Sequence, residues 1–268
     1  MLKDFDLIRH TFPNDKCVDV YPIADVHLGA IEHAKTEWEA FIKKAEAENA
    51  YLILAGDLLN NNVRGVRFAN PFDETMRPRE AKRRMVEYLE PLKDRILCVT
   101  SGNHEQRTLR DSDQDLTYDI CCKLGIEDYY RENVCFMAIS VSERKTYDKT
   151  KPEVTYTFCV THGDFSGALT GGMVNRNERF GGIIEGLDCL VTAHAHKGAV
   201  TKPSKIVIDT RANVVSVKHY VAISCVSWLN YGGYAARKML TPAQVCDPQK
   251  IHLDYNLHTR AKRIITTW

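Results

Sequence analysis

The chain contains side chains of the kinds that bind divalent cations, and they occur in short clusters along the sequence. Carboxylates, imidazoles and amide oxygens are common ligands of such cations in hydrolytic centres. Two cations about 3.5 to 4 Å apart share a bridging ligand, a role that an aspartate can fill and a histidine cannot. The residues that together predict a two-metal site are Asp25, His27, Asp57, Asn103, His162, His194 and His196.

Each cluster follows an apolar segment that we expect to be a β-strand, and segments with helical periodicity lie between the early strands. Alternation of strands and helices predicts an α/β fold. Because ligands in open α/β folds gather beyond the carboxyl ends of the strands, we expect the clusters to meet at one rim. The expected strands are residues 18–24, 50–55, 95–100, 154–160 and 186–192, and the expected helices are residues 36–48 and 78–89.

The other segments predict one domain with two long loops. No repeat, low-complexity tract or proline-rich linker divides the sequence, so we expect a single domain over residues 1–268. Its motif-bearing core covers about residues 18–200, and strands within 201–268 should extend or cover the sheet. Residues 60–79 and 163–182 are expected to be loops, and loops of this length are often functional. A solvated tail is expected at Arg260, Lys262 and Arg263.

The composition is that of an ordinary globular protein. Hydrophobic residues make up 44% and charged residues 26%, and a formal net charge of +1 offers no general attraction for a polyanion. The nine cysteines are scattered and lie mostly in apolar runs, as expected for reduced core residues in a cytoplasmic protein. No segment approaches the roughly 20 apolar residues that span a bilayer, so no association with a membrane is expected.

Taken in order, the clusters resemble the motifs of the calcineurin-like metallophosphoesterase family. The family's motifs are D-x-H, G-D, G-N-H-[ED], H and G-H-x-H, and the resemblance covers about residues 18–200. Ala193 replaces the glycine that usually begins the last motif, and both residues are small. The resemblance implies a four-layer αββα sandwich, with mixed sheets inside and helices outside, and the activity of a metal-dependent phosphoesterase.

The resemblance also implies a role for each ligand. Asp57 would bridge two metals, and a hydroxide shared between them would be the nucleophile, because bound water can lose its proton near neutral pH. One metal would be held by Asp25, His27 and His196, and the other by Asn103, His162 and His194. Manganese is the expected metal, with iron and zinc as alternatives, because this mixed oxygen and nitrogen ligand set accepts several ions.

Three residues near the motifs are candidates for contact with the substrate. His104 matches the family's histidine beside the scissile phosphate, which protonates the leaving oxygen or stabilises the transition state. Asn60 and Arg107 lie just beyond two motifs and are candidate substrate-binding residues, Arg107 as a donor to phosphate.

The residues around two motifs favour a phosphodiesterase. The chain reads Gly56-Asp57-Leu58-Leu59-Asn60-Asn61, without the Asp-Arg-Gly that follows Gly-Asp in the serine/threonine phosphatase branch of the family. Asp25-Val26-His27-Leu28-Gly29-Ala30 is more similar to the repair-nuclease and nucleotide-phosphodiesterase branches, and the chain also resembles stand-alone phosphoesterases of bacteriophages and prophages. We therefore expect a phosphodiesterase whose substrate is DNA, RNA or a nucleotide. The alternatives are a phosphomonoesterase and a non-catalytic scaffold.

Overall fold

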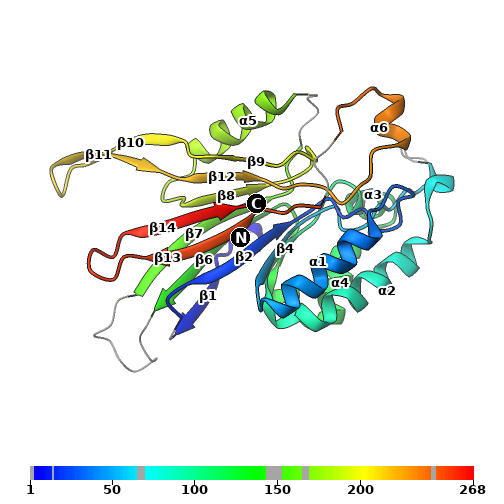
Figure 1. The fold of residues 1–268 in the computed structure, drawn as a ribbon, viewed down its shortest axis with the longest axis horizontal. Helices are drawn as coiled ribbons and strands as arrows, with labels where there is room; N and C mark the ends of the chain where they lie inside the picture. Colours follow the sequence, from blue (N-terminus) through cyan, green and yellow to red (C-terminus); the bar gives the residue numbers. More distant parts are fainter. Residues whose placement is uncertain (1–2, 14, 65–69, 143–152, 165–168, 243–245) are drawn as a thin grey trace.

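Two six-stranded β-sheets lie face to face in a computed structural model of the chain, and helices cover their outer faces (Figure 1). The structure describes residues 3–13, 15–64, 70–142, 153–164, 169–242 and 246–268. The strand orders are β1-β6-β7-β8-β12-β9 in one sheet and β14-β13-β2-β3-β4-β5 in the other, and both sheets mix parallel with antiparallel pairs. The expected α/β sandwich with mixed sheets inside is confirmed.

The sheet that contains β2 carries the first three predicted strands as parallel neighbours. Their residues are almost entirely buried and rich in Val, Ile and Leu, as expected for parallel strands that are covered on both faces. The predicted tail is wrong in its conformation, because Lys262 and Arg263 begin β14, an edge strand paired antiparallel with β13, although both side chains are exposed as expected. The strands of this sheet are β2 (Val18–Ile23), β3 (Tyr51–Ala55), β4 (Ile96–Thr100), β5 (Tyr130–Arg131), β13 (Lys250–Tyr255) and β14 (Lys262–Thr267).

The other sheet contains the last two predicted strands of the motif region, which are again parallel neighbours. Two strands after residue 200 form a separate hairpin that projects from the body of the molecule (Figure 1). The sheet consists of β1 (Ile8–Pro13), β6 (Val134–Ser142), β7 (Glu153–Thr161), β8 (Cys189–Thr192), β9 (Ala199–Thr201) and β12 (Val221–Ser224), and the hairpin of β10 (Ser204–Asp209) and β11 (Val214–His219).

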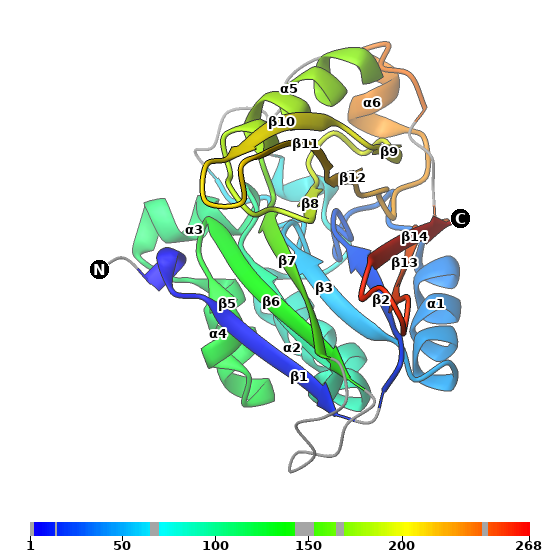
Figure 2. The same cartoon turned by 90° about the vertical axis from the view of Figure 1, so that its left-hand side faces the viewer.

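Helices occupy both sides of the paired sheets, with α1, α2 and α4 on one side and α5 on the other (Figure 2). The predicted helices 36–48 and 78–89 correspond to α1 and α2. The α-helices are α1 (Lys35–Ala47), α2 (Pro78–Leu89), α3 (Glu105–Ser112), α4 (Leu116–Leu124), α5 (Thr170–Gly182) and α6 (Gly233–Arg237). Short 3-10 helices are η1 (Lys3–Phe5), η2 (Pro71–Asp73), η3 (Glu90–Arg95) and η4 (Glu127–Tyr129).

The hydrophobic core has separate layers that hold this architecture together. One apolar cluster lies between the two sheets, a second joins α1, α2 and α4 to the β2 sheet, and a smaller one lies under α5. All nine cysteines are free and six of them are buried, which agrees with their expected place in the core. No helix within the described residues has the length and apolar character needed to cross a bilayer.

The prediction that residues 163–182 form a loop is wrong for residues 170–182, which form α5. Met173, Asn177 and Gly181 recur every four residues and are buried on one face of the helix. A Cβ atom at Gly181 would lie 2.9 Å from the hydroxyl oxygen of Tyr220, so glycine is needed for the helix to approach this side chain. Gly181, one of the glycines that suggested a loop, therefore serves the close packing of a helix.

Candidate metal centre

The predicted ligands lie directly after five strand ends on one rim of the two sheets. The strands β2, β3 and β4 run parallel in one sheet, and β7 and β8 run parallel in the other, so the turns after them can meet. Many of these turn residues have a left-handed backbone, which costs non-glycine residues about 1 to 3 kcal/mol each and is concentrated at functional sites. The left-handed ones are Asp25 (φ 52°), His27 (φ 47°), Asp57 (φ 50°), His194 (φ 67°) and His196 (φ 55°).

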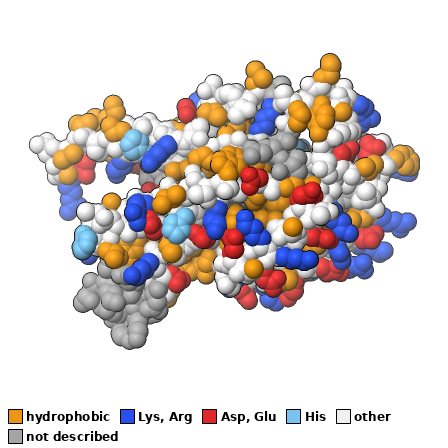
Figure 3. Space-filling view, in the orientation of Figure 1, with side chains coloured by type: hydrophobic (Ala, Val, Ile, Leu, Met, Phe, Trp, Pro, Cys, Tyr) orange, Lys and Arg blue, Asp and Glu red, His pale blue; other side chains and the backbone are white. Residues whose placement is uncertain are grey.

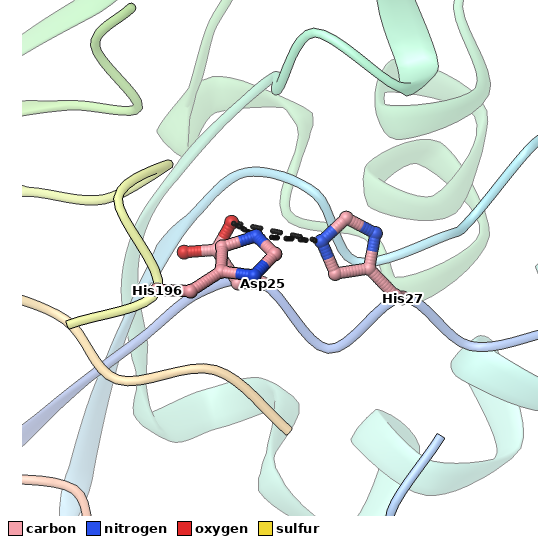
Figure 4. A group of neighbouring side chains, drawn as sticks. All are labelled: Asp25, His27 and His196. Atoms are coloured by element: carbon pink, nitrogen blue, oxygen red, sulfur yellow. Dashed lines mark hydrogen bonds and ion pairs between the residues drawn. The ribbon is translucent and has the colours of Figure 1, made fainter. Parts of the chain in front are cut away.

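Asp25, His27 and His196 form a first group of converging ligand atoms (Figure 4). Oδ1 of Asp25 lies 3.2 Å from Nε2 of His196 and 3.8 Å from Nε2 of His27. The two imidazole nitrogens are 3.1 Å apart. Oδ1 of the fully buried Asp25 has no hydrogen-bond donor among the described residues, and a cation placed between the three atoms would satisfy it.

Asn103, His162 and His194 form a second group. The amide oxygen Oδ1 of Asn103 lies 3.0 Å from Nε2 of His162 and 2.7 Å from Nδ1 of His194, and the two imidazole nitrogens are 3.3 Å apart. His162 is held from behind, because its Nδ1 lies 2.8 Å from the carbonyl oxygen of Ala55. That contact places an N–H on Nδ1, so Nε2 is the ring nitrogen that faces the group.

Asp57 lies between the two groups. Its Oδ2 is 3.3 Å from Nε2 of His162 in the second group and 3.8 Å from Nε2 of His27 in the first. Its Oδ1 is occupied, since the backbone N–H of His104 donates to it at 2.9 Å. A single oxygen atom of Asp57 therefore faces both groups, as a bridging ligand requires.

Electrostatics favours positive charge in this centre. Burial would raise the pKa of Asp25, but His196 and His27 hold it well below its usual range. Asp57 behaves in the same way, with His162 and His104 offsetting its burial. Burial would lower the pKa of His162, yet Asp57 raises it to about 10. The buried carboxylates thus draw protons onto neighbouring imidazoles, and together with the oxygen and nitrogen donor set this fits bound divalent cations.

His104 lies at the edge of the centre, with its ring 4.4 Å from that of His27 and its Nε2 3.9 Å from Oδ2 of Asp57. Its Nδ1 is 2.5 Å from the carbonyl oxygen of Asn60, so Nδ1 carries the proton, and Nε2 accepts from the guanidinium Nη2 of Arg107 at 2.8 Å. Burial lowers the pKa of His104 to about 3, although Asp57 opposes this shift. The ring is therefore neutral, with Nε2 as the proton acceptor.

The structure places the two predicted substrate-binding residues against His104. The side-chain amide of Asn60 donates to Glu74 at 3.1 Å and is buried, so it is the backbone carbonyl of Asn60 that contacts the histidine. Arg107 is partly buried and also donates to the carbonyl oxygen of Asn60 at 3.2 Å and to Oδ1 of Asn62 at 2.8 Å. The backbone of Asn60 thus orients His104. Of the two predicted substrate-binding residues, only Arg107 places a charged group beside the centre.

Glu105 is a buried residue that the candidate set omitted. Its Oε2 accepts from the backbone N–H groups of Asp57 at 3.1 Å and Gly102 at 3.0 Å, and its Oε1 accepts from that of Leu59 at 2.8 Å. Burial raises its pKa to about 7, and the charge of Asp57 adds to the effect. Glu105 therefore joins the turn that carries Asp57 to the turn that carries Asn103. Its place next to His104 in the G-N-H-E cluster was the available sequence signal.

A cavity of 540 Å³ opens beside the second group, and its walls include Asn103, His162 and Ala193. Its other lining residues are mainly polar and include Arg110 and Arg176. A cavity of 650 Å³ between α5 and β10 contains none of the predicted site residues. The smaller cavity is the one relevant to chemistry, because it adjoins the converging ligand atoms.

Comparisons with known proteins bear on the same part of the chain. A family model described as calcineurin-like phosphoesterase matches residues 20–198, a span that includes every predicted ligand. No curated protein matches the sequence. A similar solved structure is described as GAP50, the anchor in the inner membrane complex of Plasmodium. It has 10% sequence identity and a TM-score of 0.42, and the match covers 93% of this chain and 83% of that one.

Proposed function

The chain belongs to the calcineurin-like phosphoesterase family and is a metal-dependent phosphoesterase, and we propose that it is a phosphodiesterase acting on nucleic acids or nucleotides. The observation that carries the two-metal hydrolytic part of the proposal is the position of Oδ2 of Asp57, which faces His162 at 3.3 Å and His27 at 3.8 Å. A shared carboxylate oxygen between two imidazole-containing groups is the arrangement that a pair of cations needs.

The seven converging residues are assigned as two ligand sets in this proposal. Asp25, His27 and His196 would hold one cation, Asn103, His162 and His194 would hold the other, and Asp57 would contact both. Manganese is the proposed metal, with iron and zinc as alternatives, since the set combines carboxylate and amide oxygens with imidazole nitrogens. The cations, when bound, supply an acidified water as nucleophile and neutralise charge on the phosphate.

His104 and Arg107 act on the substrate side of the centre. In the absence of substrate Nε2 of His104 is unprotonated and accepts from Arg107, so it would have to take up a proton from solvent before it could give one to the leaving oxygen. Arg107 therefore has to release Nε2 as the substrate enters. The guanidinium can then donate to a phosphate oxygen, because its geometry suits bidentate contact with phosphate. Nδ1 stays fixed on the carbonyl oxygen of Asn60 throughout, which keeps the ring oriented.

Two observations favour a diester over a monoester. A diester extends beyond the scissile phosphate on both sides, and the 540 Å³ cavity beside Asn103 and His162 offers room for the second ester group. The turn after Gly56-Asp57 continues with Leu58 and Leu59, which are buried, and lacks the Asp-Arg-Gly of the serine/threonine phosphatase branch. The nucleic acid or nucleotide class rests on the resemblance of the segment 25–30 to the nuclease and phosphodiesterase branches.

The test compares hydrolysis of bis-p-nitrophenyl phosphate with that of p-nitrophenyl phosphate, after removal of adventitious metal and with manganese added back. We expect faster cleavage of the diester, and loss of this activity in Asp57→Asn and His104→Ala. Asp94→Asn, at an exposed position away from the centre, is the matched control and should retain activity. Faster cleavage of the monoester would indicate a phosphomonoesterase, and no metal-dependent cleavage of either ester would favour the scaffold alternative.

A further inference from the structure

The cavity beside Asn103 and His162 carries two arginines that the catalytic centre does not use. We propose that Arg110 and Arg176 bind a second phosphate on the substrate, covalently linked to the scissile ester. This inference rests on the proposed function, because it places the scissile phosphate at the predicted metal ligands. It narrows the substrate class to phosphodiesters that carry a further phosphate, such as a polynucleotide or a nucleotide phosphorylated at a second position.

The cavity adjoins the candidate metal centre. Asn103 and His162 belong to both, since each contributes a converging ligand atom to the centre and also forms part of the cavity wall. A molecule whose phosphate lies at these atoms would therefore have its adjoining part in the cavity. The two arginines reach it from different elements, Arg110 from the last turn of α3 and Arg176 from the middle of α5.

The charge of the two arginines is not neutralised by the protein. Arg110 donates to Oε1 of Gln106 at 2.9 Å, and within the described ranges neither Arg110 nor Arg176 has a carboxylate within 4.0 Å. Asp164 also lines the cavity, but no ion pair joins it to either arginine. Other surface arginines do pair, as Arg263 does with Asp254 at 2.6 Å. The cavity therefore offers two open guanidinium groups, which suit phosphate oxygens.

The electrostatic attraction for a second phosphate is confined to the cavity. The formal net charge is +1, and basic and acidic side chains are intermixed on the face shown in Figure 3. Such a surface gives little long-range attraction for a polyanion, so selection for a second phosphate must come from specific contacts. The remaining cavity wall suits a hydrophilic ligand, with Gln106 and Asn133 as polar groups and Phe180 as an apolar surface.

A binding experiment tests the proposal without relying on catalysis. Calorimetric titration of the manganese-loaded full chain compares thymidine 5′-phosphate with thymidine 3′,5′-bisphosphate. We expect the bisphosphate to bind at least about tenfold more tightly, since charge-assisted hydrogen bonds are the strong ones. Arg176→Gln and Arg110→Gln should each remove most of this preference. Arg179→Gln is the matched control, because Arg179 lies on the same helix but lines the other cavity.

Three results would overturn the proposal: equal affinity for the two ligands, a preference that survives both substitutions, or an equal loss in Arg179→Gln. Oligothymidylate in competition with the bisphosphate then identifies the source of the second phosphate. Tighter binding of the oligonucleotide indicates a polynucleotide, and weaker binding indicates a small nucleotide.

A kinetic experiment separates this proposal from the proposed function. The substrates are the p-nitrophenyl ester of thymidine 5′-phosphate and the same ester with a 3′-phosphate. Arg176→Gln should raise KM for the second ester about tenfold and leave kcat and the first ester unchanged, which also shows that the variant is folded. If neither ester is cleaved while the bisphosphate still binds through the arginines, the phosphodiesterase proposal fails and the phosphate site stands. If both esters are cleaved equally by all variants, the phosphate site fails.

Discussion

Oδ1 of Asp57 accepts a hydrogen bond from the backbone N–H of His104 at 2.9 Å, and this contact directs Oδ2 toward the centre of the site. Asp25 is oriented in the same manner, because its Oδ2 accepts from the backbone N–H of His194 at 3.0 Å and its Oδ1 faces His196. Each aspartate is thus aimed by the backbone of another site residue. The contact of Asp25 joins turns of the two sheets and the contact of Asp57 joins two turns of one sheet, so the carboxylates that we propose as metal ligands also connect the turns of the site.

Replacement of Asp57 by Asn should remove the shared ligand while preserving the turn. The amide oxygen can still accept from the N–H of His104, which leaves the NH₂ group, a donor, facing His162 and His27. We expect bound manganese to fall from two per chain to at most one, with activity reduced at least about hundredfold. Metal analysis after gel filtration measures the first effect. Retention of two metals per chain would argue against Asp57 as the bridge, and Asp94→Asn should behave as the parent.

Replacement of Glu105 by Gln should weaken the connection between two turns of the site. A glutamine has one acceptor oxygen where the carboxylate has two, so at least one of the N–H groups of Asp57, Gly102 and Leu59 is left unpaired. The expected loss is about 1 to 3 kcal/mol in the free energy of unfolding, because an unsatisfied buried donor is costly. Urea denaturation measures it. Glu46→Gln, an exposed position on α1, should change stability by less than about 0.5 kcal/mol.

Removal of the imidazole in His104→Ala should affect catalysis and leave the metals bound. The structure also places His104 near His27 and Asp57, close enough for all three to hold a cation, so the metal content of this variant decides between two roles. We expect kcat to fall about 10²- to 10⁴-fold, as for loss of a general acid, with two metals retained. Loss of one metal per chain would instead assign His104 as a ligand.

A half-buried histidine far from the centre should make stability depend on pH. Nε2 of His10 donates to the carbonyl oxygen of Leu97 at 2.8 Å, and burial lowers its pKa despite this bond. The unfolded chain therefore takes up the proton first, near pH 6.5, and the contribution to stability is present above that pH and lost as pH falls through the lower folded pKa.

The measurement is urea denaturation of His10→Gln and the parent between pH 7 and pH 5. The glutamine can still donate to Leu97, so the free energy of unfolding should fall less steeply with decreasing pH than in the parent. His258→Gln, at an exposed histidine, should run parallel to the parent. Identical slopes for all three proteins would contradict the assignment.

Several features of the fold followed from local patterns along the chain. The strands that lead to Asp25, Asp57 and Asn103 are short runs of buried aliphatic residues, and their ends lie within one or two residues of the predicted positions. Helix α2 begins at Pro78 and ends at Leu89 as predicted, because proline in the first turn and the spacing of Met85 and Leu89 are local signals.

Other features depended on partners that are distant in sequence. Residues 170–182 contain four glycines and were predicted as a loop, yet they form α5, in which Gly181 packs against the distant Tyr220. Lys262 and Arg263 were expected in a solvated tail, but pairing with β13 and the contact of Arg263 with Asp254 place them in a strand. Local propensity is weak for such segments, so the tertiary contact decides the structure.

The sequence by itself determined which chemistry the chain can perform, because ligand types and their order after strands are local properties. Only the tertiary structure decided how the ligands meet. The contact between Asp25 and His194 joins residues 169 positions apart, and the turns that carry them belong to different sheets. Asn60 is a second example. Its side chain was predicted to contact substrate, but the side-chain amide donates to Glu74 and the backbone carbonyl contacts His104 instead. Such pairings follow from the packing of one sheet on the other, which no local pattern encodes.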